Sequence, residues 1–285
     1  MQARNPTRRN RSIGTAKSGY GQNNKMTIPA IAHGHHVFWE RIDNATEVTR
    51  VVSDRSLKFF IQPTRSDCIH ACTVDDIARL MSHVPPVDWE GLDAVVLRQP
   101  RRKEQTLASV WGRLAYAADL VNEVGGVRYS GPALVIEALN PTEPIKLGKS
   151  LSPDDTAELK RLRLDGHKLR LSDRNHTLDT TLESCRATQL YRTVLHELGH
   201  WVDFLEKVEH PFTRDVGNLE NDAYASLLNR YHSRPNVEKE RFAHRYAERL
   251  RKHLIAIGAI PFERDIDRDQ LTRDGLRLRD FLFST

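Results

Sequence analysis

Residues 184–208 read SCRATQLYRTVLHELGHWVDFLEKV, and this stretch decides the fold. Its apolar residues recur at spacings of three and four, the period of an α-helix with one broad buried face; they are Ala187, Leu190, Tyr191, Val194, Leu195, Leu198, Val202 and Leu205. Just upstream, Thr180 and Glu183 have the S/T-x-x-E spacing that caps a helix N-terminus. The pattern therefore predicts a long, largely buried helix with HELGH in its middle.

The HELGH motif places His196 and His200 one helical turn apart, on the same side of the helix. Buried imidazoles need partners, and zinc takes neutral imidazole nitrogens that converge on one point. Glu197, between them, is placed to act as general base on a water at such a metal. Gly199 costs up to about 1 kcal/mol inside a helix, which indicates that another backbone or the metal shell approaches closely. The competing interpretation is a chance match on a surface helix, since the chain has 13 histidines.

A catalytic zinc site commonly has three protein ligands and an open fourth position. The metzincin pattern would require a glycine at position 203 and a histidine at position 206, but the chain has Asp203 and Glu206 there. The third ligand is therefore expected to be a glutamate from a second helix. Three residues are candidates: Glu220, Glu238 and Glu240.

Glu240 is the preferred third ligand. It lies near the edge of the apolar stripe of the stretch EKERFAHRYAERLRKHLIAI, and the small Ala243 at i+3 would let this helix approach the HELGH helix closely. Glu238 belongs to the same helix start but has Arg241 at i+3. Glu220 also has an alanine at i+3 and follows His200 by twenty residues.

The sequence HELGHWVD, followed some forty residues later by E-x-F-A-x-x-Y, resembles the gluzincin zinc metallopeptidases of the anthrax-lethal-factor-like and minimal-gluzincin group. The positions that carry this resemblance are His196, Glu197, His200, Asp203, Glu240, Phe242, Ala243 and Tyr246. Glu220 is more similar in spacing to thermolysin-like enzymes, but their Asn before the glutamate and Ser-Asp after it are absent. The resemblance covers roughly residues 185–250, and it is specific for the zinc site rather than for a substrate.

The resemblance implies a zinc-dependent endopeptidase that cleaves a protein or peptide substrate, with zinc held by His196, His200 and Glu240. Glu197 would take the proton of the zinc-activated water and pass it to the leaving amine. Tyr231 is the candidate that stabilises the oxyanion, with ordinary helix packing as its alternative, and Asp203 is a candidate to orient an imidazole. The alternative function is a non-catalytic regulatory or peptide-binding protein that keeps the same core.

Upstream patterns predict a sheet. Short strands are expected at 37–42, 48–52 and 58–62, buried strands at 92–98 and 131–139, and an edge strand at 167–172; residues 106–117 fit either a strand or a helix. Helices are expected after Thr73 and from Ser152 to Gly166. The predicted fold class is α+β: a small mixed or antiparallel sheet, then a zincin-type active-site helix and a C-terminal glutamate helix. The predicted divisions are a basic leader at 1–30, an N-terminal part at 31–130 and a catalytic part at 131–285.

Composition limits the possible partners. The net charge is +5, but residues 1–39 contain six basic residues and no acid, which leaves −1 for the rest. The leader is therefore expected to be disordered, with nucleic-acid contact as a minor possibility. No apolar run is long enough to span a membrane. Three cysteines and no signal-peptide pattern favour a reducing, cytoplasmic location, with unconventional secretion as an effector left open.

Overall fold

The computed structural model describes residues 31–32, 35–102, 104, 110–147, 151, 153–171, 176–215 and 221–282. Three predictions from the sequence lie outside these residues: the basic leader at 1–30, the helix cap at Ser152 and the candidate ligand Glu220.

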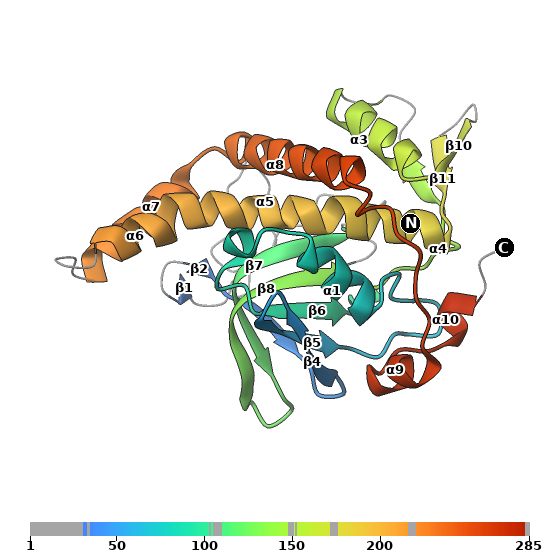
Figure 1. Ribbon diagram of the computed structural model, residues 1–285, viewed down its shortest axis with the longest axis horizontal. Helices are drawn as coiled ribbons and strands as arrows, with labels where there is room; N and C mark the ends of the chain where they lie inside the picture. The colour runs from blue at the N-terminus through green and yellow to red at the C-terminus, as the bar shows by residue number, and fades with distance from the viewer. Residues whose placement is uncertain are drawn as a thin grey trace, which may run out of the picture.

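A six-stranded mixed sheet forms the centre of the molecule, in the order β3-β7-β8-β6-β5-β4 (Figure 1). The β3–β7, β8–β6 and β6–β5 pairs are parallel, and the other two are antiparallel. The strands are β3 (Phe38–Arg41), β4 (Thr46–Val52), β5 (Arg55–Ile61), β6 (Ala94–Arg98), β7 (Gly112–Val121) and β8 (Val127–Glu137). Residues 106–117 fitted either a strand or a helix. From Gly112 onwards this segment forms strand β7.

The end of β7 that begins at Gly112 lies at an edge of the hydrogen-bonded sheet, and β2 (His35–His36) lies close to β7 without pairing with it. Strand β3 pairs only with Ala118 to Val121, after a register irregularity between Ala115 and Ala118. Among the described residues, the part of β7 before Ala118 is therefore paired with β8 alone. The edge of a sheet can offer backbone N–H and C=O groups for pairing with another chain.

Helices cover one face of the sheet (Figure 1). Helices α1 (Val74–Ser82) and α5 (Leu195–Phe204) contribute to the main hydrophobic core together with β5 and β6. Helix α8 (Asn236–Ala256) lies alongside α5 and extends this core. A smaller cluster lies on the opposite face of the sheet, where Phe60, Val96 and Val135 are fully buried.

The HELGH helix is the central part of one longer helical run. The whole run consists of α4 (Leu182–Thr188), the π-helical segment η3 (Gln189–Val194), α5, a second π-helical segment η4 (Leu205–Glu209) and α6 (His210–Asp215). Segments with π-helical bonding are rare and frequently flank functional sites. The predicted long helix is confirmed, but its cap is Thr181 with Ser184 rather than Thr180 with Glu183. Thr180 instead donates a hydrogen bond to the carbonyl of Pro141.

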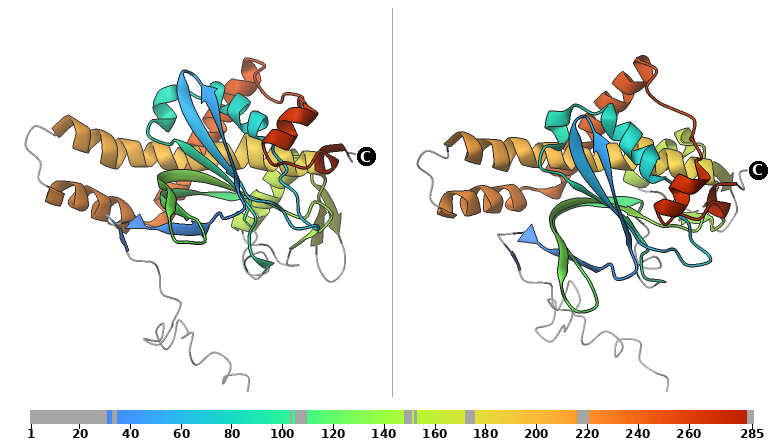
Figure 2. Two further views of the ribbon diagram at one scale, coloured as in Figure 1. Left: turned by 90° about the horizontal axis from the view of Figure 1, so that it is seen from below. Right: turned by 60° about the horizontal axis from the view of Figure 1, so that its bottom comes forward.

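The remaining elements surround this centre. Helices α6 and α7 lie side by side as a hairpin that projects from the sheet (Figure 2). The predicted edge strand before the metal helix is β10, but it belongs to a separate three-stranded sheet with β9 and β11 and not to the main sheet. These elements are α7 (Asn221–Ser233), α3 (Pro153–Leu164), β9 (Ile145–Leu147), β10 (Lys168–Leu171), β11 (His176–Asp179), β1 (Ile31–Ala32), β2 (His35–His36), η2 (Pro86–Trp89), α9 (Arg268–Arg273) and α10 (Arg279–Leu282).

The fold combines a mixed sheet with several helices, in agreement with the predicted α+β class. The boundary predicted at residue 130 falls inside β8, and the main core takes residues from both sides of it. Within the described residues, no helix has both the length and the apolar character required to cross a bilayer.

A buried histidine in this fold predicts a pH-dependent stability. His70 is buried, and its Nε2 atom lies 2.8 Å from the carbonyl oxygen of Gln62. Burial, with the cation of Arg277 acting in the same direction, lowers the pKa of His70 from 6.5 to about 4. The stability that neutral His70 contributes is therefore present above pH 6.5 and is lost as the pH falls towards 4.

Between pH 7.5 and pH 5 this loss amounts to roughly 2 kcal/mol in the free energy of unfolding. Urea unfolding at the two pH values measures it, and His70→Gln is expected to reduce the difference by about that amount. The exposed His253 supplies the control, because His253→Gln should leave the pH dependence unchanged. An equal pH dependence in wild type and His70→Gln would contradict the assignment.

Candidate metal centre

A very close contact between α5 and α8 positions the site. A Cβ atom added to Gly199 would lie 2.8 Å from both the Cα and the carbonyl oxygen of Ala243. Real side chains do not approach so closely, so only glycine at 199 permits this separation of the two helices. Gly199 indicated that another backbone approaches this helix closely, and the backbone of Ala243 does so.

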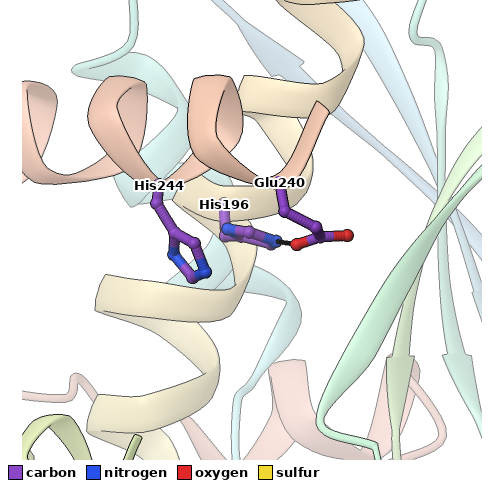
Figure 3. Close-up of side chains that lie close together, drawn as sticks. All are labelled: His196, Glu240 and His244. Carbon is purple, nitrogen blue, oxygen red and sulfur yellow. Dashed lines mark ion pairs between the residues drawn. The ribbon is translucent and has the colours of Figure 1, made fainter. Parts of the chain in front are cut away.

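The two helices bring three side chains together. The Nε2 atoms of His196 and His200 lie 3.2 Å apart. The carboxylate of Glu240 lies 3.2 Å from Nε2 of His196 and 3.5 Å from Nε2 of His200 (Figure 3 shows the first of these). The residues predicted as metal ligands from the sequence thus lie together at one point between α5 and α8.

The geometry and chemistry of these three donors fit a zinc ion. Four ligands arranged tetrahedrally at about 2.0–2.1 Å from zinc are roughly 3.3–3.4 Å from one another. The two imidazole nitrogens are 3.2 Å apart, and each lies 3.2–3.5 Å from an oxygen of Glu240 (Oε2 for His196, Oε1 for His200), which is close to that spacing. Two imidazole nitrogens and one carboxylate oxygen are also a donor set that zinc accepts.

The site is buried on the α5 side and open on the α8 side. The side chains of His196 and His200 are 16% and 12% exposed, whereas that of Glu240 is 53% exposed. Hydrogen bonding to the two imidazoles lowers the pKa of Glu240 well below its ordinary value of 4.5. The carboxylate therefore stays ionised at neutral pH, and solvent reaches the site past it.

A fourth residue, His244, belongs to the same cluster, and the sequence analysis missed it. Ligand atoms of His196, Glu240 and His244 all lie within 4.8 Å of one another. Figure 3 shows Glu240 and His244 projecting from α8 towards His196. The signal in the sequence was the i, i+4 spacing of Glu240 and His244, which puts both on one side of α8.

Glu197 connects the metal centre to the edge of the sheet. Its Oε2 atom accepts a hydrogen bond of 2.8 Å from the backbone N–H of Leu114 in β7. Burial raises the pKa of Glu197 above 4.5, while the two imidazoles and this backbone N–H act in the opposite direction. The carboxylate lies between the imidazole pair and β7, and nothing in the local sequence indicated that contact.

Tyr231 is fully buried beside the site. Its hydroxyl lies 2.9 Å from the hydroxyl of Tyr116, on β7, and donates a longer bond of 3.4 Å to the carbonyl of His200. Burial raises the pKa of both phenols well above 10. Contact between Tyr231 and a substrate would require its hydroxyl to leave Tyr116, so its catalytic role stays a prediction.

The other candidates from the sequence lie elsewhere or outside the described residues. The carboxylate of Glu238 lies 3.8 Å from Nε of Arg234, and Glu220 is not described. Asp203 is fully buried and accepts a 2.7 Å hydrogen bond from Arg234, rather than one from an imidazole. Two of the three candidate glutamates are described by the structure, and Glu240 is the one that lies beside His196 and His200.

Comparisons with profiles of known protein families, with curated proteins and with solved structures gave no match.

The Gly199–Ala243 contact predicts that a single methyl group will disrupt the centre. In Gly199→Ala the new Cβ meets backbone atoms, which cannot rotate away, so α5 and α8 must separate. Overpacking of this kind costs about 1–3 kcal/mol, against a gain of up to about 1 kcal/mol in helix propensity. We expect a lower free energy of unfolding by urea denaturation and weaker zinc binding by titration. Unchanged zinc affinity would show that the helix separation does not set the ligand geometry.

Proposed function

We propose that the protein is a zinc-dependent endopeptidase of gluzincin type. The observation that carries the proposal is the convergence of His196, His200 and Glu240, with Glu197 held between them and the edge of β7. The matching HExxH and E-x-F-A-x-x-Y patterns support the same conclusion from the sequence.

The edge of β7 supports a peptide as the substrate class. An extended peptide can add to an exposed strand edge through main-chain hydrogen bonds. The N–H of Leu114 points away from β8 and towards Glu197. A peptide along this edge would therefore run past Glu197 and the three metal-binding donors, which brings a backbone carbonyl to the site.

Glu197 is proposed as the general base. Its side chain is partly buried and bonded to β7, and burial raises its pKa, which is the direction that makes a carboxylate a better proton acceptor. A zinc ion held by His196, His200 and Glu240 would supply Lewis-acid activation of water and of the scissile carbonyl. The N–H of Leu114 holds the Glu197 carboxylate in place until a substrate reaches the edge.

Substitutions at Glu240 and Glu197 separate metal binding from catalysis. Glu240→Ala removes the carboxylate ligand, so the zinc content of the purified protein, measured by mass spectrometry, should fall well below one ion per chain. Glu197→Gln keeps the shape of the side chain but not the base, so we expect full zinc content and a loss of peptide hydrolysis of about 10²-fold or more.

Glu238→Ala is the matched control on the same helix, because the Glu238 side chain faces Arg234; both zinc content and hydrolysis should persist. Hydrolysis that survives in Glu197→Gln would remove Glu197 from the mechanism. Full zinc content without hydrolysis of any peptide by the wild type would favour the alternative of a non-catalytic peptide-binding protein.

Tyr231 is proposed as the group that stabilises the oxyanion. Tyr231→Phe keeps the buried ring and removes only the hydroxyl, so zinc content should be retained, while loss of the bond to Tyr116 should lower the free energy of unfolding by no more than about 1–3 kcal/mol. Loss of one oxyanion donor typically lowers kcat by about 10²–10³-fold, and steady-state kinetics on a peptide substrate measures this. An unchanged kcat would assign Tyr231 to packing against Tyr116 and Phe204, whose rings lie beside it.

A further inference from the structure

His244 is the one residue of the histidine and glutamate cluster that the proposed mechanism does not use. It follows Glu240 by one turn of α8, and its ring centroid lies 4.5 Å from that of His196. Its side chain is half-buried. Within the described part of the chain, no hydrogen bond or ion pair is made by the His244 imidazole. Among the described residues, this polar ring therefore lies beside two metal-binding donors without a hydrogen-bonding partner of its own.

We propose that His244 is a fourth protein ligand of the metal, in a resting state in which the site is closed. The inference rests on the proposed function and adds a form of regulation to it. With His196, His200 and Glu240 bound, a tetrahedral zinc ion has one position left. The His244 imidazole is the nearest additional nitrogen donor among the residues that form the cluster.

The required movement is small. One ring nitrogen of His244 lies no more than 4.8 Å from a ring nitrogen of His196 and a carboxylate oxygen of Glu240. His200 is not part of this group, so the His244 ring must also turn towards Nε2 of His200. Ligands of a common tetrahedral zinc are roughly 3.3–3.4 Å apart, so the nitrogen must move by about 1.5 Å or less relative to the His196 and Glu240 atoms. Rotation about the two side-chain torsions of a half-buried histidine can provide this without a change in α8.

Binding of His244 at the fourth position would block access of a substrate to the metal. Zinc sites whose four ligands all come from protein are closed, whereas catalytic sites keep one position for water or substrate. A substrate carbonyl would have to displace His244 before reaction. Because Glu240 is exposed and α8 forms the rim of the site, the displaced imidazole can swing outwards while the other three ligands stay in place.

X-ray absorption spectroscopy at the zinc edge tests the inference on the full-length protein loaded with one equivalent of zinc. Wild type is expected to show scattering from three imidazoles, those of His196, His200 and His244, and His244→Ala from two. His253→Ala, an exposed position on the same helix, is the matched control and should retain three. Circular dichroism verifies that each variant is folded, and His244→Gln provides a second, larger replacement.

Cobalt(II) substitution gives an independent readout. Azide added to the cobalt protein must displace His244 in wild type but finds an open position in His244→Ala, so it should bind more tightly to the variant. Metal affinity alone does not decide the question, because residues that only orient a ligand also change affinity by about 10–100-fold. One such role is acceptance of a hydrogen bond from Nδ1 of His196, which is buried and has no partner among the described residues.

The outcomes separate this inference from the proposed function. Two imidazoles in both wild type and His244→Ala, with equal azide affinity, would overturn the role of His244 and leave the three-ligand zinc site standing. Failure of the wild type to bind zinc at all would overturn the metallopeptidase proposal and the inference with it.

Discussion

The candidate site depends on the contact between the backbones of α5 and α8 at Gly199 and Ala243. Glycine at 199 allows this approach, because a Cβ atom there would lie 2.8 Å from the Cα and the carbonyl oxygen of Ala243. At this separation, Glu240, three residues before Ala243, and His244, one residue after it, reach the imidazole of His196. The ligand geometry is thus set by main-chain packing rather than by flexible side chains, which is how a site is held ready for a metal.

The sheet contributes the second part of the arrangement. Strand β3 pairs with only one half of β7, so the other half remains an edge, and Leu114 in that half donates to Glu197. A helix that carries two imidazoles therefore lies against a strand that can receive an extended chain. The burial of His196 and His200 and the exposure of Glu240 leave one side of the centre accessible to solvent. The proposal of peptide hydrolysis depends on this combination more than on any single residue.

Much of this was predictable from local sequence. The three- and four-residue spacing of apolar residues predicted the helix that contains HELGH, and Thr73 was correctly identified as the cap of α1, with Asp76 completing it. The alanine three residues after Glu240 favoured it over Glu238, and Glu240 lies beside the histidine pair whereas the carboxylate of Glu238 lies near Arg234. These features depend on residues that are close together in the chain, where helix periodicity and capping follow from the backbone itself.

Features that depend on long-range packing were missed or misplaced. The bond between Leu114 and Glu197 joins residues 83 positions apart, and no spacing rule indicates it. The partner of Asp203 is Arg234, in the link between α7 and α8, rather than an imidazole. The strand predicted at 167–172 is β10. It pairs with β11, which pairs with β9, and these three strands form a sheet separate from the main one. His244 had a usable signal, its i+4 spacing from Glu240, but its relevance depends on how closely α8 approaches α5.

The most direct test of the central claim is a crystal structure of the zinc-soaked protein with diffraction data collected on both sides of the zinc absorption edge. One strong anomalous peak is expected between the Nε2 atoms of His196 and His200 and the carboxylate of Glu240. A peak located elsewhere, or no peak at this position at saturating zinc, would show that these residues do not form a zinc site.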